Sequence, residues 1–443
     1  MGLFLLSPPL LAAQFLAAFN DNALRLALVL LGIGSVTAGL AAPEAQAAAQ
    51  SRATLVFVVF TLPLTLMSIP AGVLADRVSK RSVIVATKAV ELGLMLSLIP
   101  ALGFDPAGGF VPLCILAFMG ARAALLSPAK YGILPELLPE EQLSAGNGQL
   151  EMWTYLGILG GTYAGGPLVW LAGQRPWTIG VALAALSALG LVTALRVPRV
   201  AAAGARGGVV TAWADAWSAL RADPLLRLSI AGTVVFWALA GVVSQDIVVY
   251  AKVVLRASDA AASLPLAALA VGIGAGSLLA GRLARGVAAA PLEYGLIPLG
   301  ALAIAALVLL LGALGPGLGG TLALMLPLGV ASGLLAIPLN VLAQWRAPGH
   351  RRGAVIAFAN TFVFTGVMAG SLGAGALSQL GFSPTQILVA ASAVGAIGAA
   401  AAVALLPGAL PKLVRRIARG LVREALRLLA RARLRGSGDR PPR

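Results

Sequence analysis

Long apolar runs, each close to the length that crosses a lipid bilayer, alternate with short polar loops along most of this chain. A transmembrane helix needs about 20 consecutive apolar residues. Twelve runs meet this description, and they cover residues 8–34, 53–74, 82–102, 110–128, 146–172, 177–197, 226–252, 262–283, 291–314, 319–341, 352–378 and 384–406. The pattern therefore predicts an all-α integral membrane protein with twelve transmembrane helices.

An internal repeat divides these runs into two sets of six. Ser68 to Arg77 and Ser277 to Gly286 share Ser, Ala, Gly, Leu and Ala at an offset of 209 residues. The same offset relates two pairs of glycines, Gly157 with Gly366 and Gly161 with Gly370. Duplicated transporters bind their substrate near the bilayer midplane between two such repeats. We therefore expect two pseudo-symmetric six-helix bundles.

The repeat gives a domain plan. Residues 1–197 form the N-terminal six-helix bundle, 198–225 a cytoplasmic linker, 226–406 the C-terminal bundle and 407–443 a basic cytoplasmic tail. Alternate loops are rich in Lys and Arg, which stay preferentially on the cytoplasmic side of a membrane. Both termini are therefore predicted to be cytoplasmic.

Composition agrees with this plan. Hydrophobic residues make up 59% of the chain and charged residues 11%, against about 25% charged in soluble domains. The mean hydropathy is +0.94 and the net charge is +16. That charge indicates topology and attraction to anionic lipid headgroups. Nucleic-acid binding is not expected, because no folded soluble domain is available to carry it.

A polar cluster interrupts the run at 8–34. Asn20, Asp21, Asn22 and Arg25 lie near its middle, where a charge costs roughly 2.5–3.5 kcal/mol on insertion scales. Such groups are usually paired or line a water-filled path, so the cluster indicates a transport site. A simpler alternative is that Asp21 and Arg25, four residues apart on one helix face, neutralise each other.

Other charges inside the predicted spans extend this site. The charged residues are Glu91, Arg122, Lys130, Glu151 and Asp246. The second half adds an amide, Asn360, at a depth that matches Glu151 in the repeat. Two of these residues have a simpler explanation. Lys130 could extend to the membrane interface, and Asp246 could pair with Lys252. No metal-ligand spacing, nucleophile arrangement or phosphate loop is present, so we expect neither an enzyme nor a cofactor.

The segment from Gly72 to Ile84, GVLADRVSKRSVI, closely resembles the loop signature of the major facilitator superfamily. The resemblance implies that superfamily's fold and a charge network near the helix ends that holds one of two alternating conformations. The residues implied in this gating network are Asp76, Arg77, Lys80, Arg81 and Arg122. The basic residues of this loop could instead serve only to keep the loop on the cytoplasmic side of the membrane.

Further segments resemble the bacterial lysophospholipid transporter (LplT) family. They are AQFLAAFNDNALRLAL at 13–28, SPAKYGILPEL at 127–137, AGNGQLE at 145–151 and AIPLNVLAQ at 336–344. The resemblance implies import of lysophosphatidylethanolamine and lysophosphatidylglycerol across the bacterial inner membrane for re-acylation. The chain departs from the family pattern at 226–252, where Ser244, Gln245 and Asp246 stand in place of an expected cation.

Such a substrate has a phosphate anion, often a headgroup cation, and one acyl chain. We assign Arg25 and Lys130 to the phosphate, and Asp21 and Glu151 to the ammonium group or a coupling cation. The full predicted substrate set is Asn20, Asp21, Asn22, Arg25, Lys130, Glu151 and Asn360. The predicted ion-coupling residues are Asp21, Glu91 and Asp246.

The tail from Leu410 to Arg435 has leucines on one helical face and Lys or Arg on much of the rest. This pattern predicts a basic amphipathic helix on anionic membrane lipids. Docking of a cytoplasmic acyltransferase is the alternative. Two other functions also stay open at this point: proton-coupled efflux of amphipathic compounds, and a non-transporting scaffold for lipid enzymes.

Overall fold

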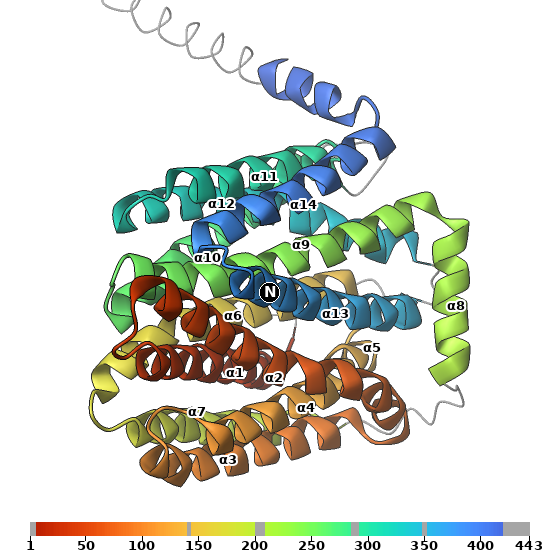
Figure 1. Ribbon diagram of the computed structural model, residues 1–443. Coiled ribbons are helices and arrows are strands. Elements are labelled where there is room, and N and C mark those ends of the chain that lie inside the picture. The colour runs from red at the N-terminus through yellow and green to blue at the C-terminus, as the bar shows by residue number, and fades with distance from the viewer. Residues whose placement is uncertain (1–5, 140–142, 200–208, 285–291, 348–351, 420–443) are drawn as a thin grey trace, which may run out of the picture.

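The computed structural model describes residues 6–139, 143–199, 209–284, 292–347 and 352–419, and it is helical throughout its regular elements (Figure 1). The helices up to the linker are α1 (Pro8–Val36), α2 (Ala42–Arg77), α3 (Lys80–Phe104), α4 (Phe110–Gly132), α5 (Leu134–Leu137), α6 (Leu143–Ala172) and α7 (Trp177–Leu195). Those after it are α8 (Val209–Ala222), α9 (Pro224–Val249), the π-helix η2 (Tyr250–Val254), α10 (Asp259–Ala284), α11 (Leu296–Leu314), α12 (Leu318–Arg346), α13 (Arg352–Gln379) and α14 (Pro384–Leu405). Residues 409–419 are helical as well.

Each of the twelve predicted spans coincides with one of these helices. Within the described residues, eleven helices are long and apolar enough to cross a membrane. The predicted span at 146–172 corresponds to α6 and is not among these eleven. Its glycines, tyrosines and threonines lower its mean hydropathy. The chain is thus an all-helical membrane protein with eleven candidate spans, and the twelfth crossing stays a prediction.

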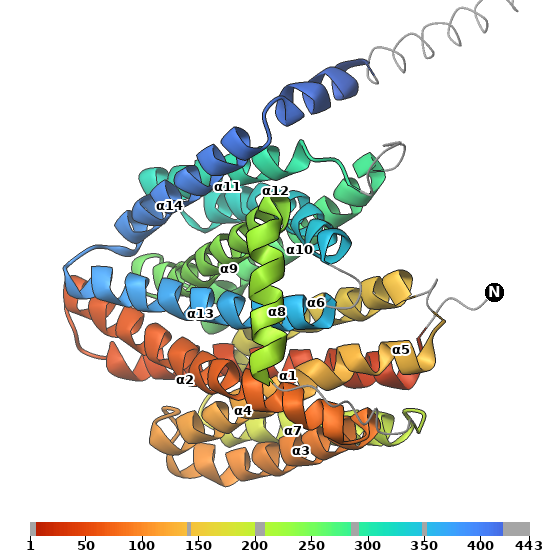
Figure 2. The same ribbon diagram turned by 90° about the vertical axis from the view of Figure 1, so that its right-hand side faces the viewer.

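The structure differs from the prediction in the start of one helix and in the content of the linker. α2 begins at Ala42, well before the predicted start at 53. Its first residues are mostly Ala, Glu and Gln, which favour a helix without adding an apolar run. The linker at 198–225 contains α8, which runs across the ends of the long helices (Figure 2). Trp213 of α8 packs edge-on against Phe358 of α13, with ring centroids 4.9 Å apart.

The linker is tied to the second half where α9 begins. The carboxylate of Asp223 accepts hydrogen bonds from the amides of Leu225 and Leu226, which caps α9. It also accepts a bond of 2.6 Å from Arg346 at the end of α12. Burial alone would raise the pKa of Asp223, but these bonds outweigh burial and hold the pKa below its usual value.

The helices pack in the same pairs in each half. In the first half, α1 packs on α6, α2 on α4 and α3 on α7; in the second, α9 packs on α13, α10 on α12 and α11 on α14. The repeated glycines make this packing possible. A Cβ on Gly161 would lie 2.1 Å from the carbonyl oxygen of Phe19, and one on Gly370 2.5 Å from that of Ala238. Each glycine therefore allows close backbone approach of α6 to α1, or of α13 to α9.

The two halves meet along α2 and α13 and along α6 and α10 (Figure 2). Near the end where α2 begins and α13 ends, Gln379 donates a hydrogen bond of 2.7 Å to Ser51. Close by along α2, Gln245 of α9 donates one of 2.5 Å to Thr54. Both contacts use uncharged side chains, so they can break and re-form without exposing a buried charge.

We predict that Gly161→Leu destabilises the protein by at least about 1–3 kcal/mol, because the new side chain collides with the backbone of α1. Thermal unfolding in detergent measures this effect. Gly93→Leu is the matched control, since a Cβ at Gly93 meets nothing within 4 Å. Equal unfolding temperatures for the two variants would contradict the close α1 to α6 contact.

Candidate functional site

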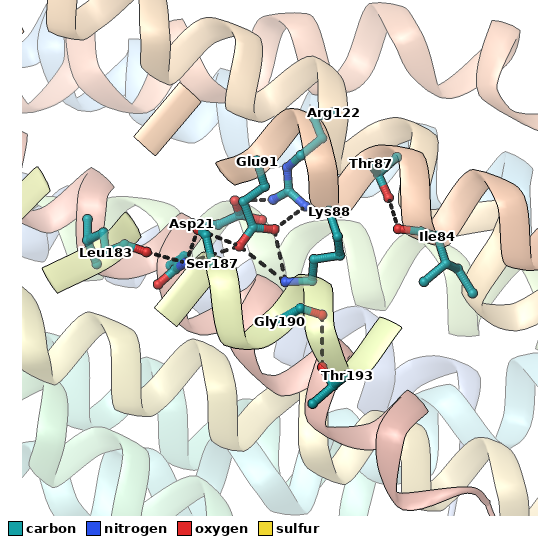
Figure 3. A network of polar contacts seen from close by, with 11 residues as sticks. Asp21, Ile84, Thr87, Lys88, Glu91, Arg122, Leu183, Ser187, Gly190 and Thr193 are labelled. Atoms are coloured by element: carbon teal, nitrogen blue, oxygen red, sulfur yellow. Dashed lines mark hydrogen bonds and ion pairs between the residues drawn. The ribbon is translucent and has the colours of Figure 1, made fainter. Parts of the chain in front are cut away.

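A buried ionic network lies inside the first half (Figure 3). Arg122 of α4 forms an ion pair with Asp21 of α1, and its Nη1 atom lies 3.0 Å from Oε2 of Glu91 on α3. Lys88, one turn before Glu91, places its Nζ atom 2.9 Å from the same oxygen. Two acids and two bases therefore balance each other where all four side chains are nearly or fully buried.

Neutral groups complete this network. The Nδ2 atom of Asn20 donates to Oε1 of Glu91 at 3.0 Å, to Oγ of Ser187 at 2.8 Å and to the carbonyl oxygen of Leu183 at 3.2 Å. Ser187 donates in turn to Glu91 at 3.2 Å. The network thus joins α1, α3, α4 and α7, and we call Asp21, Lys88, Glu91 and Arg122 its charged members.

Lys88 and Ser187 were not among the predicted site residues. A signal for Lys88 is present in the sequence, because a lysine inside an apolar run stands three residues before Glu91. No comparable signal exists for Ser187, a small residue in an apolar helix. Gly190, on the same helix, leaves room for the Lys88 ammonium, which lies 2.9 Å from where its Cβ would be.

Arg25 has different surroundings from Asp21. The ion-pair partner of Asp21 is Arg122, so Asp21 and Arg25 do not form the simple pair of that alternative, although the charge of Asp21 still acts on Arg25. The guanidinium of Arg25 donates to the side chain of Asn22 and lies over two rings of α2, 4.8 Å from the centroid of Phe57 and 5.4 Å from that of Phe60. Within the described part of the chain, no carboxylate pairs with this half-buried cation.

The remaining predicted substrate residues lie on other elements. Lys130 is only 9% exposed, with its Nζ atom 4.8 Å from the centroid of the Tyr131 ring, which does not fit a lysine that extends to the interface. It lines a small cavity together with Lys88 and Gln14. Asn360 is half-buried on α13. The side chain of Glu151 is not among those that the structure describes.

Three of the predicted gating residues have described side chains, and all three bind within the first half. Lys80 pairs with Glu136 of α5. Arg81 donates hydrogen bonds of 2.8 Å to the carbonyl oxygens of Val197 and Leu195, which the end of α7 leaves without helical partners. Arg122 does not join this loop, contrary to the prediction, because the carboxylates of α1 and α3 hold it deep in the bundle.

The other two predicted gating residues, Asp76 and Arg77, have side chains outside the described ones. The described interactions at this loop, those of Lys80 and Arg81, join helix ends of the first half. Among the described residues, no group of three or more His, Cys, Asp or Glu side chains could hold a metal ion.

Asp246 of α9 is a buried acid without a partner. Its side chain is 0% exposed, and neither carboxyl oxygen has a hydrogen-bond partner among the residues that the structure describes. The alternative that it pairs with Lys252 is wrong, because Lys252 lies 2.6 Å from Asp259 instead. The adjacent Gln245 points across to the first half, where it bonds Thr54.

The start of the tail docks on the second half. Leu413 is 1% exposed and packs with Leu296 at the start of α11, so this part of the predicted lipid-facing surface contacts protein. Arg416 donates to Glu293 at 2.6 Å and to the carbonyl oxygen of Leu283 at 2.7 Å. The tail beyond residue 419 lies outside the described residues.

Comparisons with known proteins agree with this architecture. Solved structures with similar folds include a POT family transporter in complex with 5-aminolevulinic acid, with a TM-score of 0.68 and 15% identity, covering 91% of this chain and 96% of that one. Another is the POT family transporter PepTSo, with a TM-score of 0.67 and 13% identity, covering 90% of this chain and 97% of that one. These likenesses establish the fold alone.

Sequence comparison establishes the class. The profile of the Major Facilitator Superfamily matches residues 10–371, and the helices pack in two repeated sets of pairs. The chain is a membrane transporter of this class and not an enzyme. It is 31% identical to the lysophospholipid transporter LplT of Yersinia enterocolitica over 349 residues, which are 76% of this chain and 78% of the relative.

It is also 32% identical to LplT of Serratia proteamaculans over 345 residues, covering 76% of this chain and 79% of that relative. The chain therefore belongs to the Major Facilitator Superfamily and, within it, to the family of LplT. The resemblance stated from the sequence motifs is confirmed.

We predict that Arg122→Gln destabilises the protein by roughly 3–5 kcal/mol, because it leaves buried carboxylates without their cation. Thermal unfolding of the purified protein in detergent measures the loss. The double variant Asp21→Asn with Arg122→Gln should recover part of the stability, since one unpaired charge is removed as well. A single variant as stable as the unaltered protein would contradict the structural role of the network.

Proposed function

We propose that the chain moves lysophospholipids across the membrane by alternating access and that Arg25 binds their phosphate. The observation that carries this proposal is the state of Arg25: a half-buried guanidinium in the middle of a spanning helix, which donates to Asn22, lies over two rings and forms no ion pair with a described carboxylate. Charges within spanning helices are expensive, and those that persist without a partner are candidates for substrate contact.

The chemistry around Arg25 suits this substrate. A guanidinium binds phosphate through two parallel hydrogen bonds, which a lysine cannot reproduce. Asn22 holds one side of the group, and the rings of Phe57 and Phe60 lie beneath it. The same rings supply apolar surface for the first carbons of an acyl chain. A phosphate next to an acyl chain is the defining feature of a lysophospholipid.

Family membership supports the same substrate. The relatives at 31–32% identity are named lysophospholipid transporters, and the chain covers 78–79% of their length. We propose that transport runs inward across a bacterial inner membrane, with both termini cytoplasmic, and that a re-acylating enzyme consumes the product. Efflux of amphipathic compounds and a pure scaffold role have no comparable support from the described side chains.

The other predicted residues take distinct roles in this proposal. Lys130, Glu151 and Asn360 remain proposed substrate contacts. Asp21 and Glu91, predicted to contact substrate or a coupling ion, have ion pairs and hydrogen bonds that favour a positioning role for them and for Asn20. Asn22 orients Arg25. The charged loop residues Lys80 and Arg81 stiffen the first half as it moves against the second.

We predict that Arg25→Gln raises the KM for lysophosphatidylethanolamine roughly ten- to one-hundred-fold, the loss expected for a charge-assisted contact of about 1.5–3 kcal/mol. Arg25→Lys should recover only part of the affinity, because it lacks the planar fork. Uptake of the radiolabelled lipid by cells that lack their own importer, followed to the diacyl product, measures both effects.

The matched control is Arg175→Gln, which removes an exposed arginine from the loop before α7 and should leave uptake unchanged. Surface expression and unfolding temperature are measured for every variant. Full uptake by Arg25→Gln would contradict the phosphate site. No uptake by the correctly inserted parent would reject the proposed substrate and redirect the search to efflux.

A further inference from the structure

We propose that two glycine contacts, related by the internal repeat, form a seal that closes the two halves at one end, and that the transporter opens there by separating both contacts together. The contacts are those of Gly375 with Thr54 and of Gly166 with Ser263. The opening rests on the alternating access of the proposed function, whereas the seal itself does not.

The first contact joins α13 to α2. A Cβ on Gly375 would lie 2.8 Å from Oγ1 of Thr54, which is closer than real Cβ atoms come. Gly375 is buried, so a larger side chain here would force α2 and α13 apart. The same hydroxyl accepts a hydrogen bond of 2.5 Å from Gln245 and donates one of 3.4 Å to the carbonyl oxygen of Ser371. Thr54 is thus held by two helices of the second half.

The second contact joins α6 to α10. A Cβ on Gly166 would lie 2.5 Å from Oγ of Ser263 and would also collide with the carbonyl oxygen of Asp259. Gly166 is buried, and Ser263 is 0% exposed. The preceding Gly165 instead makes room for Leu26 of α1, whose Cβ lies 2.7 Å from where the Cβ of that glycine would be. Two successive glycines of α6 therefore serve different contacts, one within the first half and one between the halves.

The internal repeat relates the two contacts to each other. Gly166 and Gly375 are 209 residues apart, and so are Thr54 and Ser263. The glycine of each half therefore meets the hydroxyl residue of the other half, as in the interface of a two-fold symmetric dimer. Because both contacts obey one pseudo-two-fold relation, a single rotation of the halves can break them together.

Both contacts lie at the same end of the bundle. α2 and α10 begin near Thr54 and Ser263, and α6 and α13 end near the two glycines. Consecutive helices alternate in direction, so these four helix ends share one side, which faces away from the cytoplasm in the proposed orientation. The contacts there are uncharged, so the seal can part without leaving a buried charge unpaired.

Distances between spin labels on the two halves test the seal. Gln174→Cys and Leu380→Cys carry the labels at exposed positions just after α6 and α13, in protein with Cys114→Ala. Gly166→Leu and Gly375→Leu should each lengthen this distance, because the new side chain wedges the halves apart. We expect the ratio of open to closed molecules to rise roughly tenfold or more.

Gly373→Leu is the matched control, because it lies on α13 two residues from Gly375 and its Cβ would meet nothing within 4 Å. A second pair of labels, on Val78→Cys and Arg282→Cys, reports the opposite end. Rotation of the halves should shorten this second distance as the first lengthens. Unchanged distances in folded Gly166→Leu and Gly375→Leu protein would overturn the seal, and a change confined to the first distance would overturn the concerted opening.

Cross-linking tests the opening without any glycine variant. Ser51→Cys and Gln379→Cys place two thiols where a hydrogen bond of 2.7 Å now joins the halves at this end. Joining the thiols with a short bis-methanethiosulfonate reagent should block uptake of labelled lysophosphatidylethanolamine, and reduction should restore it. Uptake that continues in the cross-linked protein would overturn opening at this end.

The outcomes separate this inference from the proposed function. Label distances that shift as expected, without any lysophospholipid uptake by the unaltered protein, would leave the seal in place and reject the cargo. Lysophospholipid uptake that depends on Arg25, with label distances that ignore both glycine variants, would leave the cargo in place and reject the seal.

Discussion

The structure depends on the compensation of charge inside a lipid bilayer. An ionised side chain among spanning helices is tolerated when an opposite charge and hydrogen bonds surround it, and it is costly otherwise. The first half meets this requirement with one network of two carboxylates, a guanidinium and an ammonium, all nearly or fully buried. Because its members come from α1, α3 and α4, and Asn20 links it to α7, the network fixes these four helices relative to one another.

The same constraint distinguishes structural from functional charges. Asp21, Lys88, Glu91 and Arg122 form ion pairs with one another, which favours a structural role for them. Arg25 differs from them, because among the described residues its contacts are a hydrogen bond to Asn22 and the rings of Phe57 and Phe60, with no ion pair to a carboxylate. We propose that a phosphate completes the surroundings of Arg25. The two halves are joined by neutral contacts such as Gln245 to Thr54, so these contacts can change as substrate binds in the first half.

The fold could be predicted from the sequence because its signals are strong and local. Apolar runs of bilayer length located every long helix, and the glycines that indicated the repeat lie where α6 packs on α1 and α13 on α9. The membership of the LplT family followed from short motifs. By contrast, α8 and the early start of α2 carry no long apolar run, so hydropathy alone does not reveal them.

The site was harder to predict, because partners in an ion network come from distant parts of the chain. The sequence located the charges but not their pairs: Asp21 stands four residues from Arg25, yet it binds Arg122, 101 residues away. Likewise, Lys252 is near Asp246 in sequence but pairs with Asp259. Pairing depends on which helix faces meet, and that information is tertiary.

The most direct test of the account is the binding of a lysophospholipid, compared with that of the matching monoacylglycerol without phosphate, to the purified protein and to Arg25→Gln. The account predicts that the unaltered protein prefers the phosphorylated lipid at least about tenfold and that Arg25→Gln abolishes this preference without lowering stability. An unchanged preference in Arg25→Gln would contradict the claim that the uncompensated cation of the first half is the phosphate site.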